Sequence, residues 1–196
     1  MALGKQAKII SDKQVRAVLA ELDTRRYPLR DRAIFMFSLK AGMRAKEIAS
    51  VTWGMVIDAG GEIADVIALE NRAAKGKSGR VIPMHPDLKA ALTALQRERG
   101  DRVSSDLAVI YSERDRGLSA GAVAVWFHRL YSGLGMIGCS SHSGRRTFIT
   151  RAARKIGEVG GSLRDIQQLA GHANLGTTAR YIEGDHDAQR KVVALI

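Results

Sequence analysis

The stretch LAGHANLGTTARYIEG, residues 169–184, separates a histidine and a tyrosine by nine positions and holds two threonines between them. The segment before His172 begins at Ser162 and has the cap and apolar spacing of a helix that ends near Gly171. Tyr181 carries a phenol whose ordinary pKa is about 10, so it needs a base or an electric field before it can act as a nucleophile. His172 is the nearest candidate base in the sequence. The alternative is a core aromatic whose hydroxyl reaches the surface.

A second polar group lies about thirty residues upstream, where the sequence reads His142-Ser143-Gly144-Arg145. A helix that starts near Ser141 places the imidazole and the guanidinium on one face, beside backbone N–H groups that point outward. This combination predicts a phosphate-binding site. Taken alone, it is also explained by a capping histidine and a solvated arginine.

The rest of the chain predicts a mainly α fold with a small antiparallel β-sheet, an α+β arrangement. Helical spacing and caps indicate helices over 12–23, from Pro28 to Gly42, over 87–99 and over 119–134, and Arg44 and Glu47 begin a further short helix. Short β-rich segments at 51–58, 62–69 and 80–84 are separated by turn signals and account for the sheet.

The composition indicates which kind of partner the protein binds and in which compartment it is found. The 196 residues carry 31 Lys and Arg against 20 Asp and Glu, a net charge of +11, which favours a polyanion such as DNA or RNA. This length is typical of one domain. The single cysteine, Cys139, excludes an internal disulfide and indicates a reducing compartment, for which the cytosol is the simplest location. The sequence leads us to expect neither a signal peptide nor a membrane span.

Two common cofactor sites are not supported by the sequence. Gly76-Lys77-Ser78 resembles the end of a phosphate-binding loop, but the first glycine that this loop requires is replaced by Asn71. The five histidines lack the spacing of zinc ligands, and paired cysteines are missing. We therefore expect neither a metal nor another cofactor.

Taken together, the motifs resemble those of the tyrosine recombinases, or phage integrase family, over residues 11–181. The motifs are AGMRAKEI at 41–48, a lysine in a β-turn, HSGRR at 142–146, and the stretch from Leu169 quoted above. The resemblance implies the catalytic-domain fold of that family and DNA cleavage through a 3′-phosphotyrosine. It also implies the site residues: Arg44 and Arg145 hold the scissile phosphate, Tyr181 is the nucleophile, His142 and His172 bind phosphate oxygens and transfer protons, Lys75 protonates the departing 5′ oxygen, and Glu47 supports Arg44.

Elementary chemistry is consistent with these roles. Attack by a tyrosine oxygen on a phosphodiester adds negative charge to the non-bridging oxygens, and two forked guanidiniums can meet that charge without a metal ion. Lys75 competes with Lys77, but Lys75 lies eight residues before Pro83, as the family's turn lysine does. Gly144 departs from the leucine common in this family and weakens helix propensity by about 1 kcal/mol, which suggests local flexibility.

At the scale of the whole protein, we expect residues 1–196 to form a single catalytic domain. The N-terminal clamp domain of the family is expected to be absent, and residues 182–196, which end in VVALI, are expected to dock on a neighbouring protomer. The resemblance implies double-stranded DNA as partner, four protomers on paired sites, and a prokaryotic cytoplasmic location on the nucleoid. Two alternatives keep the fold: a type IB topoisomerase-like enzyme that nicks and reseals one duplex, and a DNA-binding module without strand exchange.

Overall fold

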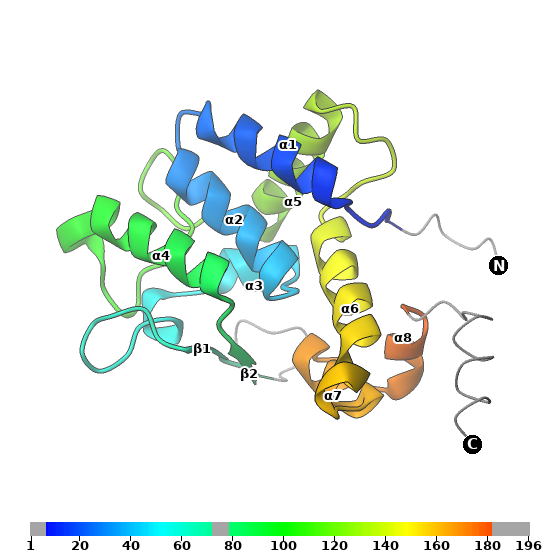
Figure 1. Ribbon diagram of the computed structural model, residues 1–196. Coiled ribbons are helices and arrows are strands. Elements are labelled where there is room, and N and C mark those ends of the chain that lie inside the picture. The colour runs from blue at the N-terminus through cyan, green and yellow to red at the C-terminus, as the bar shows by residue number, and fades with distance from the viewer. Residues whose placement is uncertain (1–6, 72–78, 182–196) are drawn as a thin grey trace, which may run out of the picture.

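Helices make up most of the computed structural model, which describes residues 7–71 and 79–181 (Figure 1). The α-helices are α1 (Asp12–Asp23), α2 (Pro28–Lys40), α3 (Ala45–Ser50), α4 (Pro86–Arg99), α5 (Ala120–Gly133), α6 (Ser143–Lys155), α7 (Leu163–Ala170) and α8 (Leu175–Ala179). Strands β1 (Val66–Leu69) and β2 (Arg80–Pro83) form an antiparallel pair, and 3-10 helices span Trp53–Met55, Gly100–Arg102 and Ile156–Val159. The predicted fold class is confirmed.

Local sequence signals fix the helix ends. Ser11 and Gln14 form a reciprocal capping box at the start of α1, and Pro28 occupies the first position of α2, where its missing N–H costs nothing. After α2, Gly42 adopts a left-handed φ of +63°, and a Cβ on it would collide with the ring of Phe148. This turn directs the chain into α3 and so places Arg44 and Glu47.

The main hydrophobic core surrounds α2, whose residues Ala33–Leu39 are all buried. Helix α2 packs against α1, α4 and α6, and α3 packs against α5. A second, smaller cluster lies between α6 and α7 and consists of Ile149, Ile166 and Ala170, with Phe148 and Tyr181 among the half-buried residues around it. In Figure 1, α7 and α8 accordingly lie at one end of α6, away from α1.

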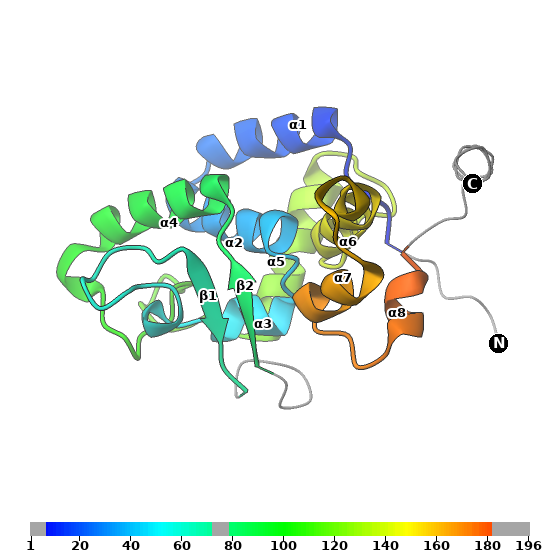
Figure 2. The same ribbon diagram turned by 60° about the horizontal axis from the view of Figure 1, so that its bottom comes forward.

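The two strands form a hairpin with one buried face. Ile67 pairs with Ile82 and Leu69 pairs with Arg80, so these four side chains point to the same side of the sheet. Figure 2 shows the hairpin beside α3 and α4, with α7 next to β2. Strand β2 therefore connects the part of the molecule around α2 to the part around α7.

Two expectations about elements were wrong or incomplete. Residues 51–58 do not form a strand: Trp53 and Gly54 donate their backbone N–H groups to Leu107 and Ser105, and the chain turns into a 3-10 helix. Within 62–69, only Val66–Leu69 is a strand. Helix α8 was not expected; it has five residues and is capped by Asn174, whose side chain accepts from the backbone N–H of Thr177. Over the two described ranges, no helix has both the length and the apolar composition needed to cross a bilayer.

Candidate active site

Glu47 is the buried centre of a cluster of arginines. It lies in the first turn of α3, and no part of its side chain is exposed. The backbone N–H of Arg44 donates to Oε2 over 2.8 Å, and the Arg44 guanidinium donates to Oε1 over 2.9 Å. Burial pushes the pKa of Glu47 up, but the hydrogen bonds and charges of Arg80 and Arg44 outweigh burial and lower it. Glu47 is therefore a carboxylate that fixes the position of Arg44.

Arg80 is the second arginine bound to Glu47. Its Nη1 donates to Oε1 over 2.8 Å and its Nη2 donates to Oε2 over 3.1 Å. This is the fork-to-carboxylate geometry that favours arginine over lysine. Arg80 was not among the predicted site residues, although a signal for it exists: it lies two positions before the apolar Ile82 in a strand, and period-two alternation puts both on the buried face.

Three arginines converge on the carboxyl end of α7. Arg80 donates to the carbonyl of Leu169 over 3.0 Å, Arg145 donates to that of Ala170 over 2.6 Å, and Arg44 lies 3.5 Å from that of Gly171. Carbonyls in the last turn of a helix have no partner within the helix and carry the negative end of its dipole. The end of α7 therefore stabilises and orients these guanidiniums.

Arg145 is the most deeply buried of the three site arginines that contact α7. Its side chain also donates to the carbonyl of Gly42 over 2.6 Å, so two backbone oxygens fix its direction. Burial first, and then the neighbouring charge of Arg44, lower the pKa of Arg145 to about 10. The group remains charged at neutral pH, which a role in holding phosphate requires.

His172 lies directly after the left-handed Gly171 and stacks on Tyr181. The ring centroids are 5.5 Å apart with an angle of 21° between the planes. Its Nδ1 lies 2.9 Å from the Oγ1 of Thr178, a buried side chain on α8. Burial first, then the charges of Arg145 and nearby arginines, lower the pKa of His172 to about 4. At neutral pH it is therefore an uncharged imidazole, and an anion that offset the arginine charges would raise its pKa.

Two adjoining hollows surround this cluster. One has a volume of about 650 Å³ and is lined by Arg44, Arg80 and His172, among others. The other, of about 220 Å³, is lined by His142 and Tyr181 together with Ala7, Arg146, Thr177 and Arg180. Thr177 lines both hollows, so the arginine cluster and the tyrosine open onto neighbouring surfaces.

The predicted residues are thus placed as follows. Arg44 is bonded to Glu47, and Arg44 and Arg145 both point to carbonyls at the end of α7. His172 follows that end and stacks on Tyr181, and the exposed His142, at the start of α6, shares the smaller hollow with Tyr181. Lys75 and its competitor Lys77 lie outside the described residues. Gly144 does not behave as a flexible point: it is buried, and a Cβ on it would lie 2.9 Å from the Cβ of Ser38.

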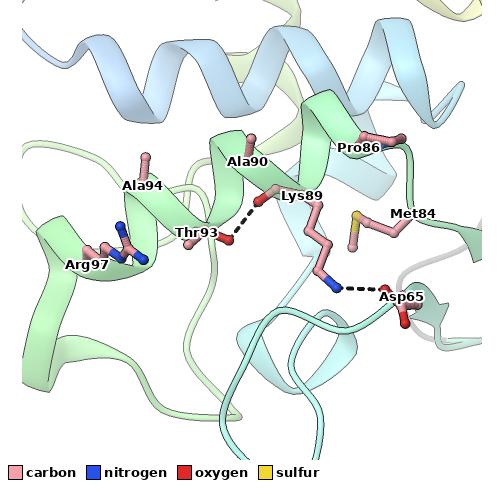
Figure 3. Close-up of a pocket in the computed structure, with 8 residues that line it drawn as sticks. All are labelled: Asp65, Met84, Pro86, Lys89, Ala90, Thr93, Ala94 and Arg97. Carbon is pink, nitrogen blue, oxygen red and sulfur yellow. Dashed lines mark hydrogen bonds and ion pairs between the residues drawn. The ribbon is translucent and has the colours of Figure 1, made fainter.

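A separate groove of about 550 Å³ runs along α4 and shares no residue with this cluster (Figure 3). Lys89 crosses it and forms an ion pair with Asp65 over 2.6 Å. Within 7–71 and 79–181, no group of three or more His, Cys, Asp or Glu side chains is arranged to hold a metal ion. The concentration of buried, charged and stacked groups at α3, β2, α6 and α7 makes that region the candidate active site.

The family model and the similar proteins of known name point to the same family. The family model described as the phage integrase family matches residues 8–187. The tyrosine recombinase XerA of Thermococcus onnurineus is 28% identical over 185 residues, which cover 94% of this chain and 61% of that protein. The tyrosine recombinase XerC of Xylella fastidiosa is 32% identical over 195 residues, which cover 97% of this chain and 61% of that protein.

Solved structures agree on the fold. The Tn1549 transposon integrase in complex with transposon right-end DNA matches with a TM-score of 0.76 at 17% identity, over 100% of this chain and 68% of that one. The XerA recombinase crystal structure matches with a TM-score of 0.73 at 19% identity, over 100% of this chain and 65% of that one. The chain therefore has the fold of these proteins and spans about three fifths of the length of the two curated relatives.

Proposed function

This chain belongs to the phage integrase family, and from that premise we propose that it cleaves and rejoins DNA strands as the catalytic part of a tyrosine recombinase. The observation that carries the proposal is the network in which Arg44 and Arg145 are fixed beside His172, whose ring stacks on Tyr181. Guanidiniums held by backbone and carboxylate oxygens form a rigid binding site for an anion that gains charge during reaction.

In the proposed reaction, the Tyr181 hydroxyl oxygen attacks the phosphorus of a DNA phosphodiester. The bond from phosphorus to this oxygen forms, the bond from phosphorus to the 5′ oxygen breaks, and the product is a 3′-phosphotyrosine. Arg44 and Arg145 stabilise the charge on the non-bridging oxygens. Because the covalent ester keeps the bond energy, a DNA 5′ hydroxyl can reverse the reaction and reseal or exchange the strand without ATP.

Two protons move in this step. The phenol of Tyr181 loses one as it attacks, and we propose that His172, whose ring stacks on that of Tyr181, accepts it once the bound phosphate offsets the arginine charges that hold its pKa low. The departing 5′ oxygen gains the other, for which we propose Lys75. His142, beside Tyr181 in the smaller hollow, binds a phosphate oxygen in this scheme.

We further propose the assembly that the family resemblance implied. A net charge of +11 suits a double-stranded DNA partner. Among proteins of the same fold, the Tn1549 transposon integrase is bound to transposon right-end DNA, the XerH recombinase to its difH substrate, and a lambda integrase dimer to a core site. In this proposal residues 1–196 act as one catalytic domain, four protomers meet on paired sites in a prokaryotic cytoplasm, and residues 182–196 dock on a neighbouring protomer.

The test is covalent capture on nicked DNA. A pool of duplexes with random sequence around a nick is labelled at the 5′ end of the scissile strand, and cleavage releases a short fragment so that rejoining is prevented. We expect a labelled protein band on a denaturing gel that is lost in Tyr181→Phe and kept in the matched variant Tyr27→Phe.

Two other results would favour the alternative functions. Binding of the pool without any covalent band contradicts the proposal and supports a DNA-binding module. A covalent band, combined with relaxation of supercoiled plasmid and no recombinant product on the recovered sequence, supports nicking and resealing of one duplex in place of strand exchange.

A further inference from the structure

Arg80 is bonded to two parts of the candidate active site, the Glu47 carboxylate and the end of α7. It begins β2, and only 8% of its side chain is exposed. Three of its nitrogen atoms have partners: two donate to Glu47, and Nε donates to the carbonyl of Leu169. A single side chain thus joins the hairpin, the first turn of α3 and the end of α7.

We propose that Arg80 is a positioning residue for strand cleavage: it fixes the Glu47 carboxylate to which Arg44 is bound, and so sets the direction in which Arg44 meets the scissile phosphate. The inference rests on the proposed function. It assigns Arg80 no contact with DNA and no part in proton transfer.

The geometry of the carboxylate supports this role. Oε1 accepts from Arg44 and from Arg80, and Oε2 accepts from the Arg44 backbone and from Arg80. Both oxygens of a fully buried group are thereby satisfied twice. Without Arg80, Glu47 would keep only its bonds to Arg44, and a buried carboxylate with unfilled acceptor positions favours protonation or movement.

The charges around Glu47 predict how a loss of Arg80 would appear. Arg44, just before α3, and Arg80, on β2, are bonded to Glu47, and the charge of Glu47 also acts on Arg145 of α6 and on His172 after α7. Removing one of the two directly bound cations leaves burial opposed mainly by Arg44, so the pKa of Glu47 rises. The pKa of His172 rises as well, because Arg80 is one of the charges that lower it.

The first experiment measures the rate of covalent capture against pH for wild type, Arg80→Met, Arg80→Lys and a control, Arg97→Met, which removes an exposed arginine on α4. We expect Arg80→Met to be slower by about 10- to 100-fold, as misplacement of a binding group often causes. The acid limb of its pH profile should lie at higher pH than in wild type. Arg80→Lys should recover part of the rate and most of the profile, because it restores the charge without the fork.

A double-mutant cycle with Glu47→Gln isolates the proposed coupling. Glutamine removes the charge that Arg80 holds, so the loss caused by Arg80→Met should be smaller in the Glu47→Gln background than in wild type. A loss of equal size in both backgrounds, an unshifted pH profile in Arg80→Met, or a wild-type rate in that variant would each overturn the inference.

A measurement without DNA separates this inference from the proposed function. We expect the difference in unfolding free energy between wild type and Arg80→Met to widen as pH rises from about 4 to about 7. In wild type the Glu47 carboxylate stabilises the fold above its unfolded pKa, whereas in the variant a buried, poorly paired carboxylate opposes folding as it ionises. A difference that stays constant with pH overturns the role of Arg80, while absence of a covalent band in wild type overturns only the proposed function.

Discussion

His172 lies in an environment very different from that of a surface histidine. It is buried among arginines, bonded to Thr178 and stacked on Tyr181, and its pKa is lowered to about 4 from 6.5. Between these two pH values an unfolded chain binds a proton at this position and the folded chain does not. The free energy of unfolding therefore falls as the pH drops from 6.5 towards 4.

The buried imidazole of His172 should therefore make the fold sensitive to acid. Replacing His172 with Asn keeps a polar group near Thr178 and removes the titration. We expect wild type to lose on the order of 1 kcal/mol more stability than His172→Asn between about pH 7.5 and about pH 5, after allowance for solvent screening. Urea unfolding at the two pH values measures this.

A control at an exposed histidine of α5, His128→Asn, should keep the acid sensitivity of wild type. Parallel loss of stability in wild type and His172→Asn would mean that His172 titrates as freely when folded as when unfolded.

At the same scale, the residues that the sequence could identify are those that belong to local patterns. His142, Arg145, His172 and Tyr181 lie in short motifs. The structure places His142, His172 and Tyr181 around one pair of hollows and bonds the buried Arg145 to the end of α7. Arg80 acts through Glu47, which is 33 positions away along the chain, and only the folded hairpin brings the two together. Charge alone could not distinguish Arg80 from the other arginines of a basic protein.

At the scale of elements, the crossing of α2 and α6 depends on a glycine. A Cβ on Gly144 would lie 2.9 Å from the Cβ of Ser38 and 3.1 Å from its backbone carbon, so the two helices would have to separate. The hydroxyl of Ser38 is buried at this crossing without a hydrogen-bond partner. The glycine that weakens helix propensity in the sequence is thus required by packing.

We predict that Gly144→Ala destabilises the fold by about 1 to 3 kcal/mol, because the cost of overpacking exceeds the helix-propensity gain of about 1 kcal/mol. Ser38→Ala removes the hydroxyl and should reduce that cost, so the double variant should be more stable than the sum of the single changes. Denaturant titration of the four proteins measures the coupling.

Gly121 provides a matched control. It occupies the second position of α5, as Gly144 does in α6, but the nearest atom to its Cβ would be 3.9 Å away. Gly121→Ala should be neutral or stabilising by up to about 1 kcal/mol. Equal effects at both glycines would contradict the packing explanation.

Elements also show where sequence reasoning succeeded and failed. Caps, prolines and apolar spacing predicted seven helices, because these signals act within a few residues. The segment 51–58 is rich in β-forming residues, yet its backbone bonds to Ser105 and Leu107, which are about fifty positions away, and it turns into a 3-10 helix. Tertiary partners decided that segment, and local propensity did not.

At the scale of the whole molecule, the described site spans two hydrophobic clusters. Arg44, Glu47 and Arg80 lie on elements that pack on the large core, whereas Tyr181 borders the small cluster of Ile149, Ile166 and Ala170. The hydrogen bonds from three arginines to the last carbonyls of α7 connect the two parts. Because local stability follows local burial, we expect α7 and α8 to open more readily than α2.

Hydrogen exchange tests this division. In wild type, the amides of α7 and α8 should exchange faster than those of α2. Ile166→Ala removes apolar contacts from the small cluster, and we expect it to raise exchange in α7 and α8 by about tenfold or more while α2 keeps its protection. Leu92→Ala, a buried change in the large core, should instead raise exchange in α2 as well.

Uniform acceleration by Ile166→Ala would mean that the molecule opens as one cooperative unit. Under the expected result, opening of α7 removes the carbonyls that orient the three guanidiniums and carries His172 away from them, although every charged side chain is still present. Ile166→Ala should then lower the yield of covalent capture in proportion to the open fraction, and DNA bound at the arginines should restore protection in α7 and α8, since a ligand stabilises the state that it binds. The small cluster would in that case control whether the site is assembled, independently of the stability of the core around α2.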